Sequence, residues 1–345
     1  MVLSITSLKT GHCHALPQTM TLIEITQPGG PEVLQPRQEA LPVAAAGEVL
    51  IRVHAAGVNR PDVIQRTGKY PMKPGMSPIP GLEVAGEVVA IGAGVNEFIV
   101  GDRVCALTNG GGYAQYCVAP ASQTLPIPDG MDWIHAAAVP ETFFTVWANL
   151  FDIGGASKGQ RALIHGGTSG IGTTALMLCR EFGVKAFATA GSEDKCAAIR
   201  QLGAEAINYR DQDFVQVIQD KTAGKGVNVI LDIMGGSYLN QNIAALGMDG
   251  RLVMLGFLGG AKANEVDLMA ILGKRATITG SLMRSRTREE KASIAEQLRE
   301  YVWPVLSAGR CVPMIDKVFA LADASQAQAR MEAGDHIGKI VLQVD

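Results

Sequence analysis

The segment from Ala162 to Gly172, which reads Ala-Leu-Ile-His-Gly-Gly-Thr-Ser-Gly-Ile-Gly, constrains the fold of this chain most strongly. A short apolar run, a glycine turn and a helical pattern through Leu178 follow one another here, and they predict a buried strand, a tight turn and a helix. The free N–H groups and the positive dipole end of such a helix favour a bound diphosphate. Because the segment lies near mid-chain, a long N-terminal part precedes this nucleotide-binding unit.

The composition restricts the class of protein. At 345 residues the chain is long enough for two domains, and its 47% hydrophobic and 18% charged residues are typical of a compact globular protein. The net charge of −3 argues against a nucleic-acid partner, and no apolar run is long enough to span a membrane. The six cysteines lack metal-site spacing, so we expect reduced thiols and a cytoplasmic protein.

The first part of the chain is rich in short strand patterns. We expect residues 1–19 to be a disordered extension, because a β-type pattern begins only at Met20. Strand patterns separated by glycine and proline then occur at 48–58, 84–91, 102–107 and 113–118. Such a series predicts a mostly β domain that forms a partly open barrel.

From residue 141 onward the pattern changes to alternating strands and helices. Short apolar strands are expected at 162–165, 185–190, 206–209, 228–232, 251–255 and 276–280. This alternation predicts an α/β fold with a Rossmann doubly wound parallel sheet. A long amphipathic helix is expected from Thr287 to Leu306, and strands at 317–319 and 338–342 should rejoin the first domain. The expected domains are therefore 20–140 with 307–345, and 141–306.

The glycine turn predicts a dinucleotide site with an unusual second position. In Gly167-Thr168-Ser169-Gly170-Ile171-Gly172, serine replaces the second glycine of G-x-G-x-x-G, and a plain tight turn is the alternative interpretation. The next strand ends at Gly191-Ser192 without the acidic residue typical of NAD enzymes, and Lys195 and Tyr209 follow. These residues favour the 2′-phosphate of NADPH, although an ordinary solvated lysine and a strand-end aromatic explain them equally well when taken singly.

Several further motifs together resemble a known family. The residues that carry the resemblance are Ala56–Asp62, Gln65–Tyr70, Pro80–Gly86, Ala137–Glu141, Ala190–Lys195 and Ile207–Tyr209. With the order of the two domains, they make the chain similar to the medium-chain dehydrogenase/reductase superfamily. The resemblance is strongest to its zinc-independent quinone oxidoreductases of the zeta-crystallin and tumour-suppressor-inducible type, and it extends from Met20 to Val344. It implies a GroES-like first domain and a homodimer.

The resemblance also assigns the substrate side of the site. Asn59 and Leu82 stand where zinc-dependent relatives have a cysteine and a histidine, so no metal is expected. Asn59 and Asp62 are expected near the nicotinamide, and Tyr70 is expected in the substrate cleft. A turn and helix cap is the alternative for Asn59 and Asp62, and a surface aromatic is the alternative for Tyr70.

Further residues are expected near the cofactor by the same resemblance. Thr145 and Gly256 should lie close to the nicotinamide and Gly235 close to the ribose, while His336 and Lys339 could reach the cofactor from the tail. The alternative for the glycines is backbone geometry alone. We interpret Arg284, Arg286 and Arg288 as a solvated loop face, His54 and His165 as interior histidines, and Glu141 as a residue that favours a helix start.

These observations predict an NADPH-dependent quinone oxidoreductase that acts without a metal on a small-molecule acceptor. No general acid is identified. Two alternatives remain: an NADPH-dependent enone or enoyl reductase of the same superfamily, for which Tyr70 is the candidate proton donor, and an NADPH-binding crystallin-like or RNA-binding protein.

Overall fold

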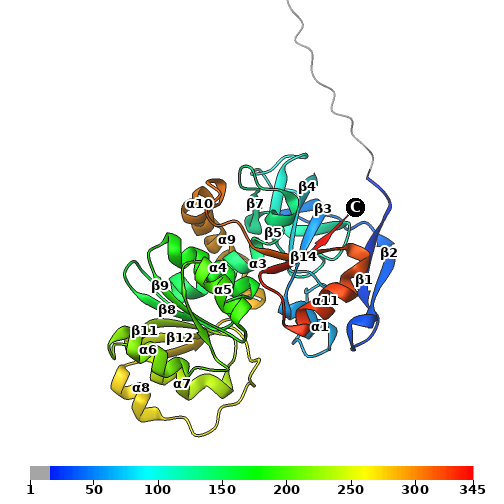
Figure 1. The fold of residues 1–345 in the computed structure, drawn as a ribbon. Coiled ribbons are helices and arrows are strands. Elements are labelled where there is room, and N and C mark those ends of the chain that lie inside the picture. The colour runs from blue at the N-terminus through cyan, green and yellow to red at the C-terminus, as the bar shows by residue number, and fades with distance from the viewer. Residues whose placement is uncertain (1–15, 345) are drawn as a thin grey trace, which may run out of the picture.

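The computed structural model describes residues 16–344, so most of the expected extension at 1–19 lies outside the described residues. Within that range the strands form one six-stranded, one seven-stranded and one two-stranded sheet. The two large sheets occupy separate halves of the molecule (Figure 1). The small sheet pairs β1 (Thr19–Ile25) with β2 (Leu34–Ala40), and β1 contains the β-type pattern that was predicted to begin at Met20.

The six-stranded sheet is parallel and has the strand order β10-β9-β8-β11-β12-β13. The order reverses between β8 and β11, which is the arrangement of a Rossmann sheet, where ligands bind at the carboxyl ends of the strands beside the reversal. Its strands are β8 (Arg161–Ile164), β9 (Lys185–Ala190), β10 (Glu205–Asn208), β11 (Val227–Asp232), β12 (Leu246–Met254) and β13 (Thr277–Gly280). The six predicted strands are confirmed, although β12 begins earlier than expected.

Helices connect these strands. They are α4 (Gly170–Glu181), α5 (Glu193–Gln201), α6 (Phe214–Thr222), α7 (Leu239–Ala245) and α8 (Leu268–Lys274). The predicted helix after the glycine turn is α4, and it continues one turn beyond Leu178. Glu193 and Asp194 lie in the first turn of α5, as their interpretation as dipole-favoured residues predicts.

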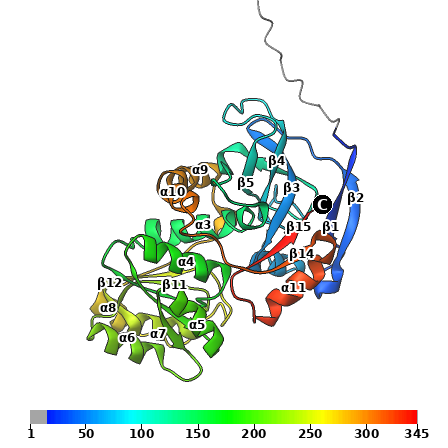
Figure 2. The same ribbon diagram turned by 45° about the horizontal axis from the view of Figure 1, so that its top comes forward.

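The seven-stranded sheet confirms the mostly β part and the return of the tail. Its strands are β3 (Glu48–Val58), β4 (Glu83–Ile91), β5 (Arg103–Leu107), β6 (Tyr116–Pro120), β7 (Thr124–Pro126), β14 (Ile315–Ala320) and β15 (Lys339–Gln343). β15 pairs antiparallel with β3, so the tail lies within the first sheet (Figure 2). The strand expected at 113–118 begins only at Tyr116, because Tyr113 is held in a loop by its N–H bond to the Pro80 carbonyl at 3.0 Å.

Helices at the ends of these strands complete this half. They are α1 (Arg60–Arg66), α2 (Trp133–Ala136), α3 (Pro140–Val146), which continues as a π-helical stretch Trp147–Ile153, and α11 (Ala324–Ala333). α1 directly follows β3 and α3 directly precedes the nucleotide-binding half. Their N-terminal ends therefore place Asn59 and Glu141 near the region where the two halves meet.

The predicted helix from Thr287 to Leu306 is confirmed but divided. It consists of α9 (Arg288–Gln297), a π-helical turn Leu298–Val302 and α10 (Trp303–Ser307). Thr287 and Glu290 form a capping box at its start, with donor–acceptor distances of 2.7 and 3.2 Å. Pro304 has no N–H to continue the α-helical bonds, which explains the irregular turn before it.

One hydrophobic cluster links the two large sheets. It includes Ala85 and Leu107 of the seven-stranded sheet, Phe143 of α3, and Ile164 and Leu231 of the six-stranded sheet, all almost fully buried. Shared packing of this kind fixes the two halves relative to each other. The domain limits at 140/141 and 306/307 stay a prediction.

Candidate functional site

The glycine turn between β8 and α4 needs its glycines for close packing. A Cβ on Gly167 would lie 2.6 Å from the Cβ of Ala188, and one on Gly172 would overlap the carbonyl of Gly166. The Ser169 hydroxyl caps α4 by accepting the N–H of Gly172 at 3.0 Å. The predicted strand, turn and helix are therefore present, and the start of α4 has the geometry that favours a phosphate.

Two of the residues predicted for the 2′-phosphate, Gly191 and Tyr209, are in contact beside β9, whereas the Lys195 ammonium is directed to the tail. The Ser192 side chain caps α5, and a Cβ on Gly191 would overlap the Tyr209 hydroxyl, so the ring of Tyr209 lies against Gly191. The Lys195 ammonium donates a hydrogen bond to the carbonyl of Gly334 in the tail. Lys195 is therefore not an ordinary solvated lysine, and the structure brings it together with the segment that leads into β15.

His336 lies in that same tail segment. Its Nδ1 is buried and has no hydrogen-bond partner among residues 16–344. Burial, aided by the charge of Lys195, lowers the pKa of His336 to about 4, so the ring is neutral near pH 7. A neutral imidazole with a free nitrogen suits a hydrogen bond to a ligand.

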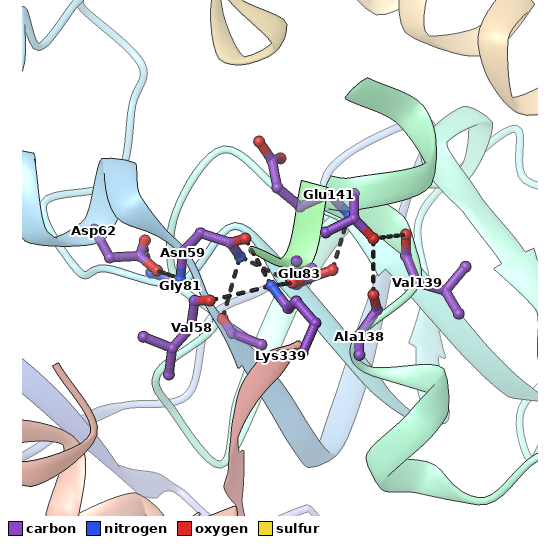
Figure 3. A network of polar contacts seen from close by, with 12 residues as sticks. Val58, Asn59, Asp62, Gly81, Glu83, Ala138, Val139, Glu141 and Lys339 are labelled. Carbon is purple, nitrogen blue, oxygen red and sulfur yellow. Dashed lines mark hydrogen bonds and ion pairs between the residues drawn. The ribbon is translucent and has the colours of Figure 1, made fainter. Parts of the chain in front are cut away.

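A buried polar network lies at the end of β3 (Figure 3). The Lys339 ammonium donates to Glu83 Oε1 at 2.6 Å, Asn59 Oδ1 at 2.7 Å and the Val58 carbonyl at 3.1 Å. Asn59 Nδ2 donates to Glu83 Oε1 at 2.9 Å, and the other Glu83 oxygen accepts the N–H of Glu141 at 2.8 Å. Asn59, Glu83 and Lys339, called the Lys339 network below, are each more than nine-tenths buried.

Asp62 sits one turn away and is fully buried. Its carboxylate accepts from the N–H groups of Asn59 at 2.8 Å and Gly81 at 3.1 Å, and from the Tyr113 hydroxyl at 3.2 Å. Burial raises the pKa of Asp62 to about 6. The helix-cap interpretation of Asp62 is thus confirmed, and its predicted place beside the nicotinamide stays a prediction.

The tail joins the Lys339 network to the glycine turn. Gly338 donates its N–H to the Thr168 carbonyl at 2.8 Å, and a Cβ on Gly170 would lie 2.5 Å from Lys339 Cδ. The alkyl chain of Lys339 therefore runs against the N-terminal end of α4. Gly170 and Lys339, which were both predicted for the cofactor, meet at this contact, and Lys339 links them to Asn59.

Thr145 lies on α3, while Gly235 and Gly256 follow β11 and β12 of the six-stranded sheet. Thr145 Oγ1 on α3 is buried without a hydrogen-bond partner in the described part of the chain. Gly235 has a φ of +76° after β11, and its turn is held by Asp232, which accepts the Gly235 N–H at 3.0 Å. A free buried hydroxyl on a residue predicted to contact the nicotinamide is what an absent polar ligand would leave, so Thr145 fits a nicotinamide dinucleotide. The places of Gly235 and Gly256 beside the cofactor stay predictions.

Tyr70, which is predicted for the substrate cleft, and Glu141 both have raised pKa values. Tyr70 is half-buried, and burial raises the pKa of its hydroxyl while the charge of Arg284 opposes that rise. Burial and the nearby charge of Glu83 raise the pKa of Glu141 to about 8, so its carboxyl is mostly protonated near pH 7. The side chain of Glu141 points away from Lys339 (Figure 3).

The interpretation of Arg284 as a solvated residue is wrong. Its side chain is 6% exposed, and its guanidinium lies 4.9 Å from the centre of the Tyr70 ring. Glu83 was also missing from the predicted site, although the sequence motif around Gly81 and Leu82 contained it. Arg288 is exposed, in agreement with the prediction, whereas Arg286 is half-buried and its Nε has no hydrogen-bond partner in the described part of the chain.

His165 is confirmed as an interior histidine, with ring contacts to Thr189 Oγ1 at 3.1 Å and Asn242 Oδ1 at 2.7 Å. His54 stacks on Trp133 with 4.5 Å between ring centres. Cys105, Cys117, Cys179, Cys196 and Cys311 are free thiols, whereas Cys13 lies outside the described residues.

The prediction that no metal is bound rests on the chemistry of the side chains at Asn59 and Leu82. Leu82 is buried and the Asn59 amide bonds to Glu83 and Lys339. In the part of the chain that the structure describes, no group of three or more His, Cys, Asp or Glu residues is placed to hold a metal ion. Metal-free chemistry stays a prediction. None of the helices described is long and apolar enough to cross a membrane.

Comparison with known proteins gives two family matches. An alcohol dehydrogenase GroES-like domain matches residues 45–129, and a zinc-binding dehydrogenase matches residues 170–299. A quinone oxidoreductase of Rattus norvegicus is 33% identical over 327 residues, which cover 94% of this chain and 97% of that protein.

Solved structures agree along almost the whole chain. A mycobacterial protein in complex with NADPH is 29% identical with a TM-score of 0.83, covering 94% of this chain and 99% of that one. The CurK enoyl reductase is 26% identical with a TM-score of 0.82, covering 95% and 100%.

Proposed function

The chain belongs to the medium-chain dehydrogenase/reductase superfamily, with zeta-crystallin-type quinone oxidoreductases as homologues, and from this premise we propose that it is an NADPH-dependent, metal-independent quinone oxidoreductase. The observation that carries the proposal is the contact between Lys339 and Gly170, which joins the phosphate-type glycine turn to the Asn59 side chain. A nicotinamide dinucleotide laid along this turn would reach the buried network where an acceptor is expected. The quinone oxidoreductase named among its relatives supports the acceptor class.

The preference for NADPH over NADH is supported by the edge of β9. No carboxylate ends that strand, and Ser192, Lys195 and Tyr209 present a hydroxyl, an ammonium and a phenol at the place where the ribose of a dinucleotide is expected. Lys195 has a single hydrogen bond to a carbonyl, which a phosphate would replace with a stronger charge-assisted bond. The NADPH complex of a structural relative supports this choice.

The residues of this chain would orient the cofactor. When bound, NADPH supplies a hydride to the acceptor. Glu83 fixes the Asn59 amide and the Lys339 ammonium in one arrangement, so neither group has to reorganise during the reaction. Lys339 uses its three N–H groups on Glu83, Asn59 and the Val58 carbonyl, so its role would be to hold the Asn59 amide in place beside the glycine turn.

The first experiment is an acceptor panel. Naphthoquinones, phenanthrenequinone and small enones are supplied with NADPH or NADH in buffer containing a chelator, and loss of reduced-nicotinamide absorbance is followed. We expect turnover with quinones, unchanged by the chelator, and a lower KM for NADPH than for NADH. Lys195→Ala should raise the KM for NADPH and leave that for NADH nearly unchanged, while the exposed Lys225→Ala is the control. Equal use of NADH, or activity lost to the chelator, would overturn the assignment.

Reduction of an activated C=C bond is the second candidate. The observation that favours it is the half-buried hydroxyl of Tyr70, and the likeness to an enoyl reductase supports it. Tyr70→Phe separates the two reactions, because a general acid contributes about 10²–10⁴-fold to turnover. An enone reductase that uses Tyr70 should lose most of its activity, whereas quinone reduction should change little.

A homodimer is proposed on the exposed apolar face of α8. Leu268, Met269 and Leu272 are 66%, 72% and 68% exposed. α8 packs beside β12 (Figure 1), which pairs with the edge strand β13. Monomeric proteins rarely leave large apolar side chains so close together in water.

The division of the chain into domains at 140/141 and 306/307 is proposed because the two large sheets are separate.

A further inference from the structure

Arg284 connects the nucleotide-binding half to three segments of the other half. It lies just after β13, and its guanidinium donates to Gln65 Oε1 on α1 at 2.7 Å and to the carbonyls of Asn109 at 2.9 Å and Ser77 at 3.4 Å. Gln65 in turn donates to the Pro78 carbonyl at 2.8 Å. One side chain thus fixes both α1 and the loop that runs from Thr67 to Pro80.

The charge of Arg284 has no carboxylate partner within ion-pair distance in the described chain. A cation that is 94% buried is held instead by neutral oxygens and by the face of the Tyr70 ring, at 4.9 Å. A cation over an aromatic face contributes about 0.5–2 kcal/mol, and more when it is shielded from water. The position of the Tyr70 ring is therefore coupled to that of Arg284.

A second contact tightens the same region. The Lys291 ammonium on α9 donates to Asn109 Oδ1 at 2.7 Å, so the Asn109 segment is bound through both its side chain and its carbonyl. By contrast, the Arg288–Glu48 ion pair at 3.1 Å crosses between the same halves at an exposed position. Substitutions of Arg284 and of Arg288 therefore separate an effect on the position of Tyr70 from the loss of just any polar contact between the two halves.

We propose that Arg284 is a positioning residue for the acceptor site, which sets acceptor affinity by holding the loop from Thr67 to Pro80 so that the Tyr70 ring stays in place. The claim that Arg284 sets acceptor affinity rests on the proposed function. The structural part of the proposal, that the loop depends on Arg284, holds for the protein whatever acceptor it reduces. Arg284 acts through Tyr70, and the hydride and proton transfers do not involve it.

The kinetic test compares Arg284→Met, Arg284→Lys and the control Arg288→Met. Arg284→Met should raise the acceptor KM about tenfold or more, because a small displacement of a positioning group can cost up to about 10²-fold. The dissociation constant for NADPH should stay unchanged. Arg284→Lys keeps a positive charge near the Tyr70 ring but lacks the planar guanidinium with its several donors, so it should raise the acceptor KM less than Arg284→Met does. Arg288→Met should behave like the unaltered protein.

The decisive comparison repeats Arg284→Met in a Tyr70→Ala background. If Arg284 acts through Tyr70, the second substitution should then change acceptor kcat/KM by less than about twofold. Equal losses in both backgrounds, or a parallel loss of NADPH affinity, would overturn the proposal.

An activity-independent measurement covers the case in which no quinone or enone is reduced. Trypsin can cut after the exposed Lys69, next to Tyr70, and local opening controls such cleavage. The cleavage rate after Lys69, followed by mass spectrometry, should rise about tenfold in Arg284→Met and remain unchanged in Arg288→Met. An unchanged rate in both Arg284 variants would contradict the positioning role, and a raised rate without acceptor turnover would refute the proposed function alone.

Discussion

Removal of the charge at Lys339 should reveal how strongly the Lys339 network holds the two halves of the site. The side chains of Lys339 and Glu83 are 4% and 0% exposed, and their charged atoms are 2.6 Å apart. Breaking such a buried pair by removing one partner destabilises a protein by about 3–5 kcal/mol. Glu83 keeps two other donors, from Asn59 and Glu141, so we expect Lys339→Met to cost about 3 kcal/mol, at the lower end of this range.

The assay is a double-mutant cycle. Urea unfolding is followed by the fluorescence of Trp133, Trp147 and Trp303 in Lys339→Met, Glu83→Gln and the double variant. Each single substitution should cost about 3 kcal/mol, and the double variant should cost little more than either, because no uncompensated charge then remains. Lys185→Met, at an exposed position, should change stability by less than about 0.5 kcal/mol. Additive losses in the double variant would show that the two residues do not act as a buried ion pair.

Three further predictions follow from other groups. Burial raises the pKa of Glu141 from 4.5 to about 8, so the folded state keeps a proton that the unfolded state has lost, and this group lowers the free energy of unfolding as the pH rises between those values. Glu141→Gln should remove that part of the fall, and an unchanged pH dependence in urea melts would contradict this prediction. Gly170→Ala should lower stability by about 1–3 kcal/mol and weaken NADPH binding, because the new Cβ would displace Lys339. Gly273→Ala is the control: its Cβ has open space around it, so it should be neutral or stabilising in thermal melts, and equal behaviour of the two variants would refute the packing argument. Leu272→Glu should convert a dimer to a monomer in light scattering, and a protein that is already monomeric would contradict the proposed α8 interface.

The sequence predicted those parts of the fold whose signals are local. The strand, turn and helix at Ala162–Leu178 depend on glycines and apolar residues close together in the chain, and the Rossmann sheet follows from that unit and its repetition. The cap formed by Asp62 and Asn59 is equally local, since the two residues are three apart. The apolar pattern of the tail also predicted that its strands rejoin the first domain, whereas the pairing of β15 with β3 is known only from the structure.

The site itself depends on contacts between distant residues, which no local pattern contains. Lys339 reaches Glu83 across 256 positions, and Arg284 reaches Gln65 across 219. Arg284 is the first of three arginines in five residues, a composition typical of a solvated surface, and it is its contacts with the distant Gln65, Ser77 and Asn109 that bury it. Lys195 likewise finds its partner in the tail at Gly334, which the spacing around the nucleotide motif does not indicate.

An anaerobic single turnover tests the central claim most directly. Protein loaded with one equivalent of NADPH, in the presence of a chelator, is mixed with excess phenanthrenequinone, and reduced-nicotinamide absorbance and hydroquinone are measured together. We predict that one hydroquinone forms for each NADPH oxidised, and that Lys339→Met slows the step while the control Lys185→Met does not. NADPH that stays reduced with every quinone tested, or oxidation that requires an added metal ion, would contradict the account.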